Sequence, residues 1–195
     1  MKMKPIIFST AMTKAILEGR KKQTRRAIKP QPTPYLSEND GGDYWNWNNK
    51  LLWPHRGFGS SKYQNLTSYA PYKPGDILYV KETWSNSAHD QFGALKLTSY
   101  AYKASDVHSG RIWKSSRYMP KEAARIFLQV VDVRVECLCQ IATSDAIAEG
   151  FSSGERESET DAFYKYWNKL NTKRGYGKEK NPWVWVIEFE RTEMP

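Results

Sequence analysis

A long stretch with β-strand character, residues 126 to 136, is the feature that most constrains the fold. Val131, Val133 and Val135 alternate there with charged residues. Alternation with a period of two places the two kinds of side chain on opposite faces of a strand. The alternation changes phase near Val130, which predicts a β-bulge at that point. The chain is therefore expected to be built around β-strands.

Further strands are expected elsewhere in the sequence, over residues 5–8, 77–84, 97–103 and 183–190. A turn should precede the second of these, because Pro74 and Gly75 stand where turn residues are favoured. The last strand carries its apolar residues on one face, namely Trp183, Trp185, Ile187 and Phe189.

Helix signals occur at three places. Ser9 or Thr10 can cap a first helix, which Gly19 is expected to end in a left-handed conformation. Thr143 is expected to cap a short helix over residues 144–149. A third, amphipathic helix has apolar residues at helical spacing, at Phe163, Tyr166, Trp167 and Leu170. This set of elements predicts an α+β fold, a small mixed β-barrel with flanking helices, as one domain over residues 1–195.

Residues 31–72 show no sustained hydrophobic period. They are rich in Asn, Gly, Ser, Pro and aromatic residues. Long segments without regular structure are uncommon in domains, and the many aromatic residues argue against disorder. We therefore expect an ordered, aromatic-rich insertion packed on the domain, with a short hairpin.

The formal net charge is +9. A basic protein often has an anionic partner, most commonly nucleic acid, although a basic surface can also serve only solubility. Cys137 and Cys139 are expected to be reduced thiols, and His55, His89 and His108 have no ligand-like spacing, so neither a metal site nor a cofactor is expected. With no signal peptide and no membrane-spanning stretch, a cytoplasmic protein is expected. The oligomeric state stays open.

The most informative segment for function is Gly19-Arg20-Lys21-Lys22-Gln23-Thr24-Arg25-Arg26. Clustered cations on a folded protein usually meet an anion, although a solvated basic loop is the simpler reading. Cationic neighbours would lower the pKa of Lys21, and a neutral lysine can act as the base for a hydroxyl such as that of Thr24. In a regular strand these two side chains would lie on opposite faces, so a bend between them is required.

The pattern Gly-x-Lys-x-x-Thr-x-Arg after a first helix resembles the signature of the ASCH domain, a relative of the PUA RNA-binding barrel. Thr at position 24 resembles the bacterial N4-acetylcytidine amidohydrolase branch of that family. The resemblance continues at residues 75–78, at the segment Asp145-Ala-Ile-Ala-Glu-Gly150 and in the aromatic strand at 183–189. The whole chain is similar to the larger ASCH proteins of phages and prophages. The ASCH core would cover residues 4–30 and 73–190, with the segment between them as a departure from the minimal amidohydrolase.

This resemblance implies a role for four residues. Lys21 matches the lysine that activates the nucleophile, and Thr24 matches the nucleophile itself. Glu149, about 125 positions further along, matches the acidic residue of the same site. Arg26 matches the arginine that binds the substrate or an oxyanion.

Other candidate substrate-binding residues come from charge and aromatic character. Lys22 and Arg25 belong to the basic segment and could contact phosphates. Glu82 stands on an otherwise apolar strand, and Trp84 follows on the same face, where a base could stack on it. A buried tryptophan in the core is the simpler reading of Trp84.

The resemblance implies an amidohydrolase acting on an N4-acylated cytidine or a related nucleoside amide, and no cofactor is expected. Two alternatives remain open at this point: a non-catalytic RNA-binding module of the PUA type, and an ASCH-type ribonuclease. Both would use the same basic segment on RNA phosphates. The expected partner is therefore a modified nucleoside or RNA, and no membrane partner is expected.

Overall fold

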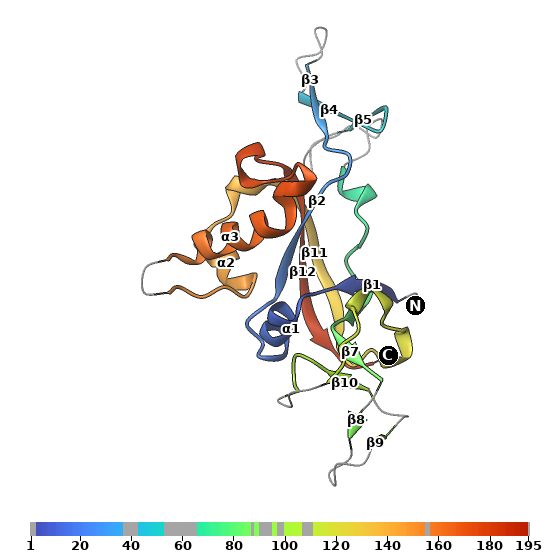
Figure 1. The fold of residues 1–195 in the computed structure, drawn as a ribbon. Coiled ribbons are helices and arrows are strands. Elements are labelled where there is room, and N and C mark those ends of the chain that lie inside the picture. The colour runs from blue at the N-terminus through green and yellow to red at the C-terminus, as the bar shows by residue number, and fades with distance from the viewer. Residues whose placement is uncertain are drawn as a thin grey trace.

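The computed structural model describes residues 3–36, 43–52, 66–86, 88–89, 95–96, 100–106, 111–154 and 157–194. Its main element is a five-stranded sheet in the order β1-β6-β11-β12-β2 (Figure 1). The strands are β1 (Lys4–Ile7), β6 (Ile77–Lys81), β11 (Phe127–Cys137), β12 (Trp183–Thr192) and β2 (Gln23–Ala27). β1 and β6 are parallel, and the other neighbours are antiparallel.

The α+β class is confirmed, but the sheet is not closed into a barrel. β1 and β2 form its two edges, and no backbone ladder joins them among the described strands. The guanidinium of Arg26 on β2 instead donates a hydrogen bond to the backbone oxygen of Ile7 on β1, at 3.0 Å. A side chain thus spans the opening that a barrel would close with backbone hydrogen bonds.

β11 and β12 form the long central pair of the sheet. Their register shifts between Val130 and Asp132, which confirms the predicted bulge. The bulge leaves Val131 half exposed while Val130 and Val133 stay buried. The side chain of Val131 therefore leaves the core at the point where the alternation changes phase.

The two faces of β12 are buried in two different cores. Trp185, Ile187 and Phe189 pack in the larger core, which also receives α1 (Thr10–Leu17). Val184 and Val186, on the opposite face, pack in a second core with α2 (Thr143–Ala148) and α3 (Glu159–Asn171). Because helices cover both faces, the first half of this strand, Trp183 to Ile187, is apolar at every position.

The helix ends agree with the sequence in part. Ser9 caps α1 by accepting a hydrogen bond from the backbone N–H of Met12, as expected. The prediction that Thr143 caps α2 was wrong, since Thr143 is already helical and Ala142 holds the cap position. The carboxylate of Asp145 accepts the backbone N–H of Ala142, which stabilises the earlier start. α3 has the predicted amphipathic spacing, with Phe163 among its buried residues.

The insertion contains a small antiparallel sheet of β3 (Thr33–Leu36), β4 (Asp43–Trp47) and β5 (Lys50–Leu52), which extends beyond the end of the main sheet (Figure 1). Asn48 and Asn49 both have positive φ and make the two-residue turn between β4 and β5. The other described part of the insertion is the short helix η1 (Leu66–Tyr69), and residues 53–65 lie outside the described part.

Short elements lie near the end of β6. They are β7 (Trp84–Ser85), β8 (Ala88–His89), β9 (Leu95–Lys96), β10 (Ala101–Tyr102), η2 (Ser116–Tyr118) and η3 (Lys121–Ala123). Three more short helices lie elsewhere: η4 (Leu138–Gln140) follows β11, and η5 (Thr172–Arg174) and η6 (Lys178–Lys180) follow α3. The strand expected over 77–84 is thus divided into β6 and β7. Of the strand expected over 97–103, only Ala101–Tyr102 is a strand, and residues 97–99 lie outside the described part. No helix in the described ranges is both long and apolar enough to cross a membrane.

Candidate functional site

The site is built where two helices end. After α1, the N–H of Gly19 bonds to the oxygen of Ile16 and the N–H of Arg20 to that of Ala15, the Schellman pattern. After α2, the N–H groups of residues 150 and 151 bond in the same pattern to the oxygens of residues 147 and 146. The two turns lie against each other, and a β-bridge joins Lys21 to Glu149.

Close contact between these turns depends on Gly150. Its φ is +94°, and a Cβ added there would lie 2.9 Å from the Cβ of Ala15 and 3.1 Å from that of Lys21. Glycine meets both requirements, because it adopts positive φ without strain and adds no side chain. The dipeptide Glu149-Gly150 therefore sets how closely the acidic residue approaches Lys21.

Lys21 is buried and bound by three acceptors. Its Nζ donates to Glu149 Oε2, to the backbone oxygen of Glu149 and to the backbone oxygen of Gln23, each at 2.7 Å. The second of these acceptors lies at the C-terminal end of α2, where the helix dipole favours a cation. Burial lowers the pKa of Lys21; the Glu149 carboxylate opposes this, and the charges of Arg26 and Arg25 add to it.

Thr24 and Arg26 lie beside this pair, on β2. Arg26 Nη1 donates to Thr24 Oγ1 at 2.9 Å. Because β2 begins at Gln23, Lys21 precedes the regular strand, and both Lys21 and Thr24 line the same pocket. Among the hydrogen bonds of the described residues none joins Lys21 directly to Thr24.

Arg25 is fully buried on the side of the second core. Its Nη2 donates to Glu136 Oε2 and Asp145 Oδ2, both at 2.9 Å. Its Nη1 lies 3.5 Å from Glu149 Oε1, and neither of these two atoms has a hydrogen-bond partner within the described ranges. Burial raises the pKa of Asp145, but the charge of Arg25 and several hydrogen bonds outweigh this, so the pKa of Asp145 is lowered overall.

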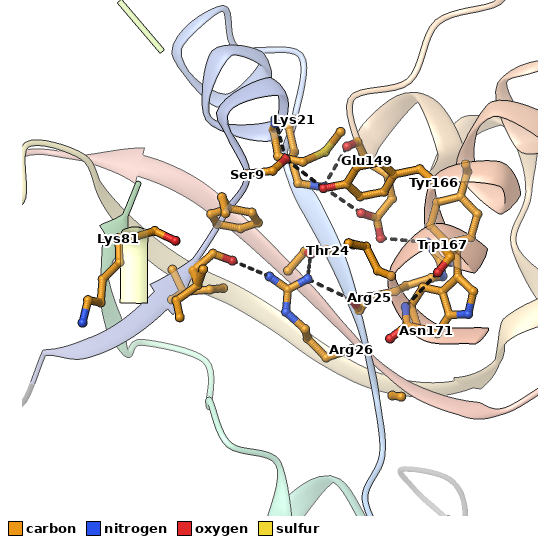
Figure 2. Close-up of a pocket in the computed structure, with 18 of the residues that line it drawn as sticks. Ser9, Lys21, Thr24, Arg25, Arg26, Lys81, Glu149, Tyr166, Trp167 and Asn171 are labelled. Atoms are coloured by element: carbon orange, nitrogen blue, oxygen red, sulfur yellow. Dashed lines mark hydrogen bonds and ion pairs between the residues drawn. The ribbon is translucent and has the colours of Figure 1, made fainter. Parts of the chain in front are cut away.

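A pocket of about 720 Å³ lies in the opening between β1 and β2, and its lining includes Lys21, Thr24, Arg25, Arg26 and Glu149. Figure 2 shows Thr24 and Arg26 at its centre and α3 on one side, with Tyr166 and Trp167. Tyr166 and Ser9 share a hydrogen bond of 2.8 Å across it. Further aromatic rings, including Phe8 and Tyr72, also line it. Pockets of this size bind small molecules the size of cofactors or nucleosides.

Three of the residues singled out from sequence do not line this pocket. Lys22 is exposed next to it. Glu82 is buried and forms a bidentate ion pair with Arg125, whose Nε and Nη2 lie 2.9 and 3.1 Å from its carboxylate oxygens. Trp84 is buried with Met119 in a small separate core, as in the simpler reading of its sequence position.

Sequence reasoning missed several residues of the pocket. They are Ser9, Tyr72, Lys81, Arg117, Tyr166 and Arg174, among others. The amphipathic spacing of α3 indicated Tyr166 as a core residue, whereas the cations come from short elements and strand ends without a pattern of their own. Within the described residues no group of three or more His, Cys, Asp or Glu side chains could hold a metal ion.

The chain was compared with known proteins. No protein-family model and no curated protein matches the sequence. An ASCH domain from Lactobacillus crispatus matches the structure with a TM-score of 0.46 and 10% identity, over 99% of this chain and 81% of that one. The structure is similar to that of an ASCH domain. A protein from Enterococcus faecalis assigned to the family DUF984 matches with a TM-score of 0.47 and 9% identity, over 100% of this chain and 84% of that one.

These structural matches assign no role to any residue of this chain. Roles within the pocket rest on the chemistry of Lys21, Thr24, Arg26 and Glu149 in this chain.

Proposed function

We propose that this chain is an ASCH-type amidohydrolase that acts on an N4-acylated cytidine or a related nucleoside amide. One observation carries the proposal. Lys21, Thr24 and Glu149, the three residues that the ASCH resemblance implies for catalysis, line one pocket together with Arg26, although 128 positions separate Lys21 from Glu149. A hydroxyl, an amine with a lowered pKa and a carboxylate form the set that covalent amide hydrolysis requires.

In the proposed reaction Thr24 Oγ1 attacks the acyl carbon of the substrate, and a C–O bond forms. Lys21 takes the hydroxyl proton, for which its amine must be neutral. The short hydrogen bond from Lys21 Nζ to Glu149 Oε2, 2.7 Å, provides a route for the ammonium proton to the carboxylate. The low local dielectric of the buried site strengthens this hydrogen bond.

The C–N bond then breaks, and the leaving amine receives the proton held by the Lys21–Glu149 pair. Water hydrolyses the acyl ester on Thr24 in a second step, which releases the carboxylic acid and restores the hydroxyl. Arg26 Nη1, 2.9 Å from Thr24 Oγ1, is close enough to stabilise the negative charge that develops at the acyl oxygen.

The test is release of cytidine from N4-acetylcytidine by the purified protein. We expect Thr24→Ala and Lys21→Ala to abolish turnover, because each removes a reacting group. Thr143→Ala, an exposed threonine away from the pocket, is the matched control and should keep full activity. Turnover retained by a folded Thr24→Ala variant would refute the covalent mechanism.

RNA binding or RNA cleavage is the second candidate, favoured by the excess of cations along the pocket. In that case Thr24→Ala would leave RNA affinity nearly unchanged, and the affinity would fall steeply with salt concentration. Loss of one cation that contacts a phosphate should reduce the slope against salt by about one unit.

A further inference from the structure

The charges of the pocket are strongly unequal. Six cationic side chains line it, from Lys21, Arg25, Arg26, Lys81, Arg117 and Arg174, against one carboxylate, that of Glu149. Two of the six are neutralised by ion pairs: Lys21 pairs with Glu149, and Arg25 with Glu136 and Asp145. The other four have no ion pair with any carboxylate in the described ranges.

Arg26 has only neutral groups as hydrogen-bond partners. It donates to Thr24 Oγ1 and to the backbone oxygens of Arg25 and Ile7. Burial lowers the pKa of Arg26, and Glu149 opposes this, but an arginine side chain stays charged in proteins. A partly buried charge without a bonded counter-ion is costly, which favours a negatively charged ligand in the pocket.

A second cationic group lies on the opposite side of the pocket from α3. Figure 2 shows Lys81, at the end of β6, on the side of Arg26 away from Trp167. Lys81 Nζ donates to the backbone oxygen of Arg117 at 2.7 Å, which holds the ammonium against η2. The pocket surface here also includes Ser115 and Ser116. An ammonium, a guanidinium and two hydroxyls are thus gathered within one wall.

We propose that this wall, formed by Lys81, Ser115, Ser116 and Arg117, binds the phosphate of a nucleotide, while the base lies toward Tyr166 and α3. The inference rests on the proposed function for the place of the base, and it makes the substrate a phosphorylated nucleoside. Phosphate suits this set of groups because its oxygens accept charge-assisted hydrogen bonds from a guanidinium and an ammonium, and further bonds from hydroxyls. Arg174, on the other side of the opening, adds to the positive field that attracts the anion.

The proposal can be tested by binding alone, through titration calorimetry with cytidine, cytidine 5′-monophosphate, cytidine 3′-monophosphate and inorganic phosphate. We expect one of the two monophosphates to bind at least about tenfold more tightly than cytidine at low salt. Arg117→Ala removes the guanidinium but keeps the backbone oxygen that holds Lys81. It should therefore remove the preference for the monophosphate and leave cytidine affinity unchanged. Lys81→Met should reduce the preference in the same way.

Lys121→Ala and Lys173→Ala are matched controls, because both remove an exposed cation near the same elements without touching the pocket. They should keep the preference for the monophosphate. A cytidyl dinucleotide identifies the source of the phosphate. If the dinucleotide binds more tightly than the monophosphate, the phosphate belongs to RNA; if it binds more weakly, the phosphate belongs to a free nucleotide.

Equal affinities for cytidine and its monophosphates, or a preference that survives in Arg117→Ala, would overturn the proposal. Binding is measured also with Thr24→Ala, in which no turnover is expected. A phosphate preference in a wild-type protein that hydrolyses no N4-acetylated substrate would contradict the amidohydrolase proposal and leave the phosphate site standing.

Discussion

In its charged form Lys21 has no lone pair with which to accept a proton from Thr24. Its three ammonium protons are donated to Gln23 and Glu149. The protonation state of this one amine therefore controls the proposed reaction. Burial favours the neutral form, and the Glu149 carboxylate favours the charged form. In the wild type, kcat/KM for N4-acetylcytidine should rise with pH around a value below the ordinary lysine pKa of 10.5.

Glu149→Gln tests this balance. Loss of the negative charge removes the main influence that raises the pKa of Lys21, so that pKa should fall further. The rise of kcat/KM should then occur at lower pH than in the wild type, even though the maximal rate falls. Glu18→Gln, at an exposed glutamate, is the control and should leave the profile in place. A profile that stays unchanged in Glu149→Gln would exclude Lys21 as the base.

At the level of the elements, the two helix ends offer a comparison between matched glycines. Gly19 and Gly150 both have positive φ, but only Gly150 has neighbours within 4 Å of the position that a Cβ would take. Gly19→Ala should cost about 1–2 kcal/mol of unfolding free energy from backbone strain alone. Gly150→Ala should cost more, because Ala15 and Lys21 must also move. It should also reduce turnover, since Glu149 would shift relative to Lys21.

Thermal unfolding and activity assays check this prediction. For a chain of this size each kcal/mol lowers Tm by about 2–4 °C. Equal Tm values for the two variants would mean that the contact between the helix ends contributes nothing to stability.

Local patterns predicted the elements better than their assembly. The caps at Ser9 and Gly19, the bulge after Val130 and the amphipathic α3 all follow from side-chain spacing, and the structure confirms them. The start of α2 was missed, because the side chain of Asp145 stabilises a start one position before the expected cap. The open sheet could not be read from spacing, since closure depends on whether strands distant in sequence pair with each other.

The residues of the pocket were also predicted only in part. The motif led to Lys21, Thr24 and Glu149, which lie together, because a short run with unusual chemistry stands out in a sequence. Lys81 and Arg117 stood out in no pattern, because each is a single cation in a basic chain and gains its place only from the fold. Glu82 and Trp84 stood out from their strand but serve packing and an ion pair in the structure.

For the whole molecule, the two cores share the central strands, since β12 contributes one face to each. We therefore propose that residues 1–195 form one domain and unfold in one cooperative step. Denaturant unfolding followed by far-UV circular dichroism and by tryptophan fluorescence should give superimposable transitions. Two separated transitions would show that the insertion or the α3 region is a domain of its own.

The order of the strands also has a consequence for synthesis on the ribosome. β2, which carries Thr24 and Arg26, is made early, yet its partner among the described strands is β12, which follows much later in the sequence. During synthesis β2 therefore has no strand partner in this sheet until residues 183–192 have emerged. We therefore expect a chain truncated before residue 183 to lack the strand that holds Thr24 and Arg26 in the sheet.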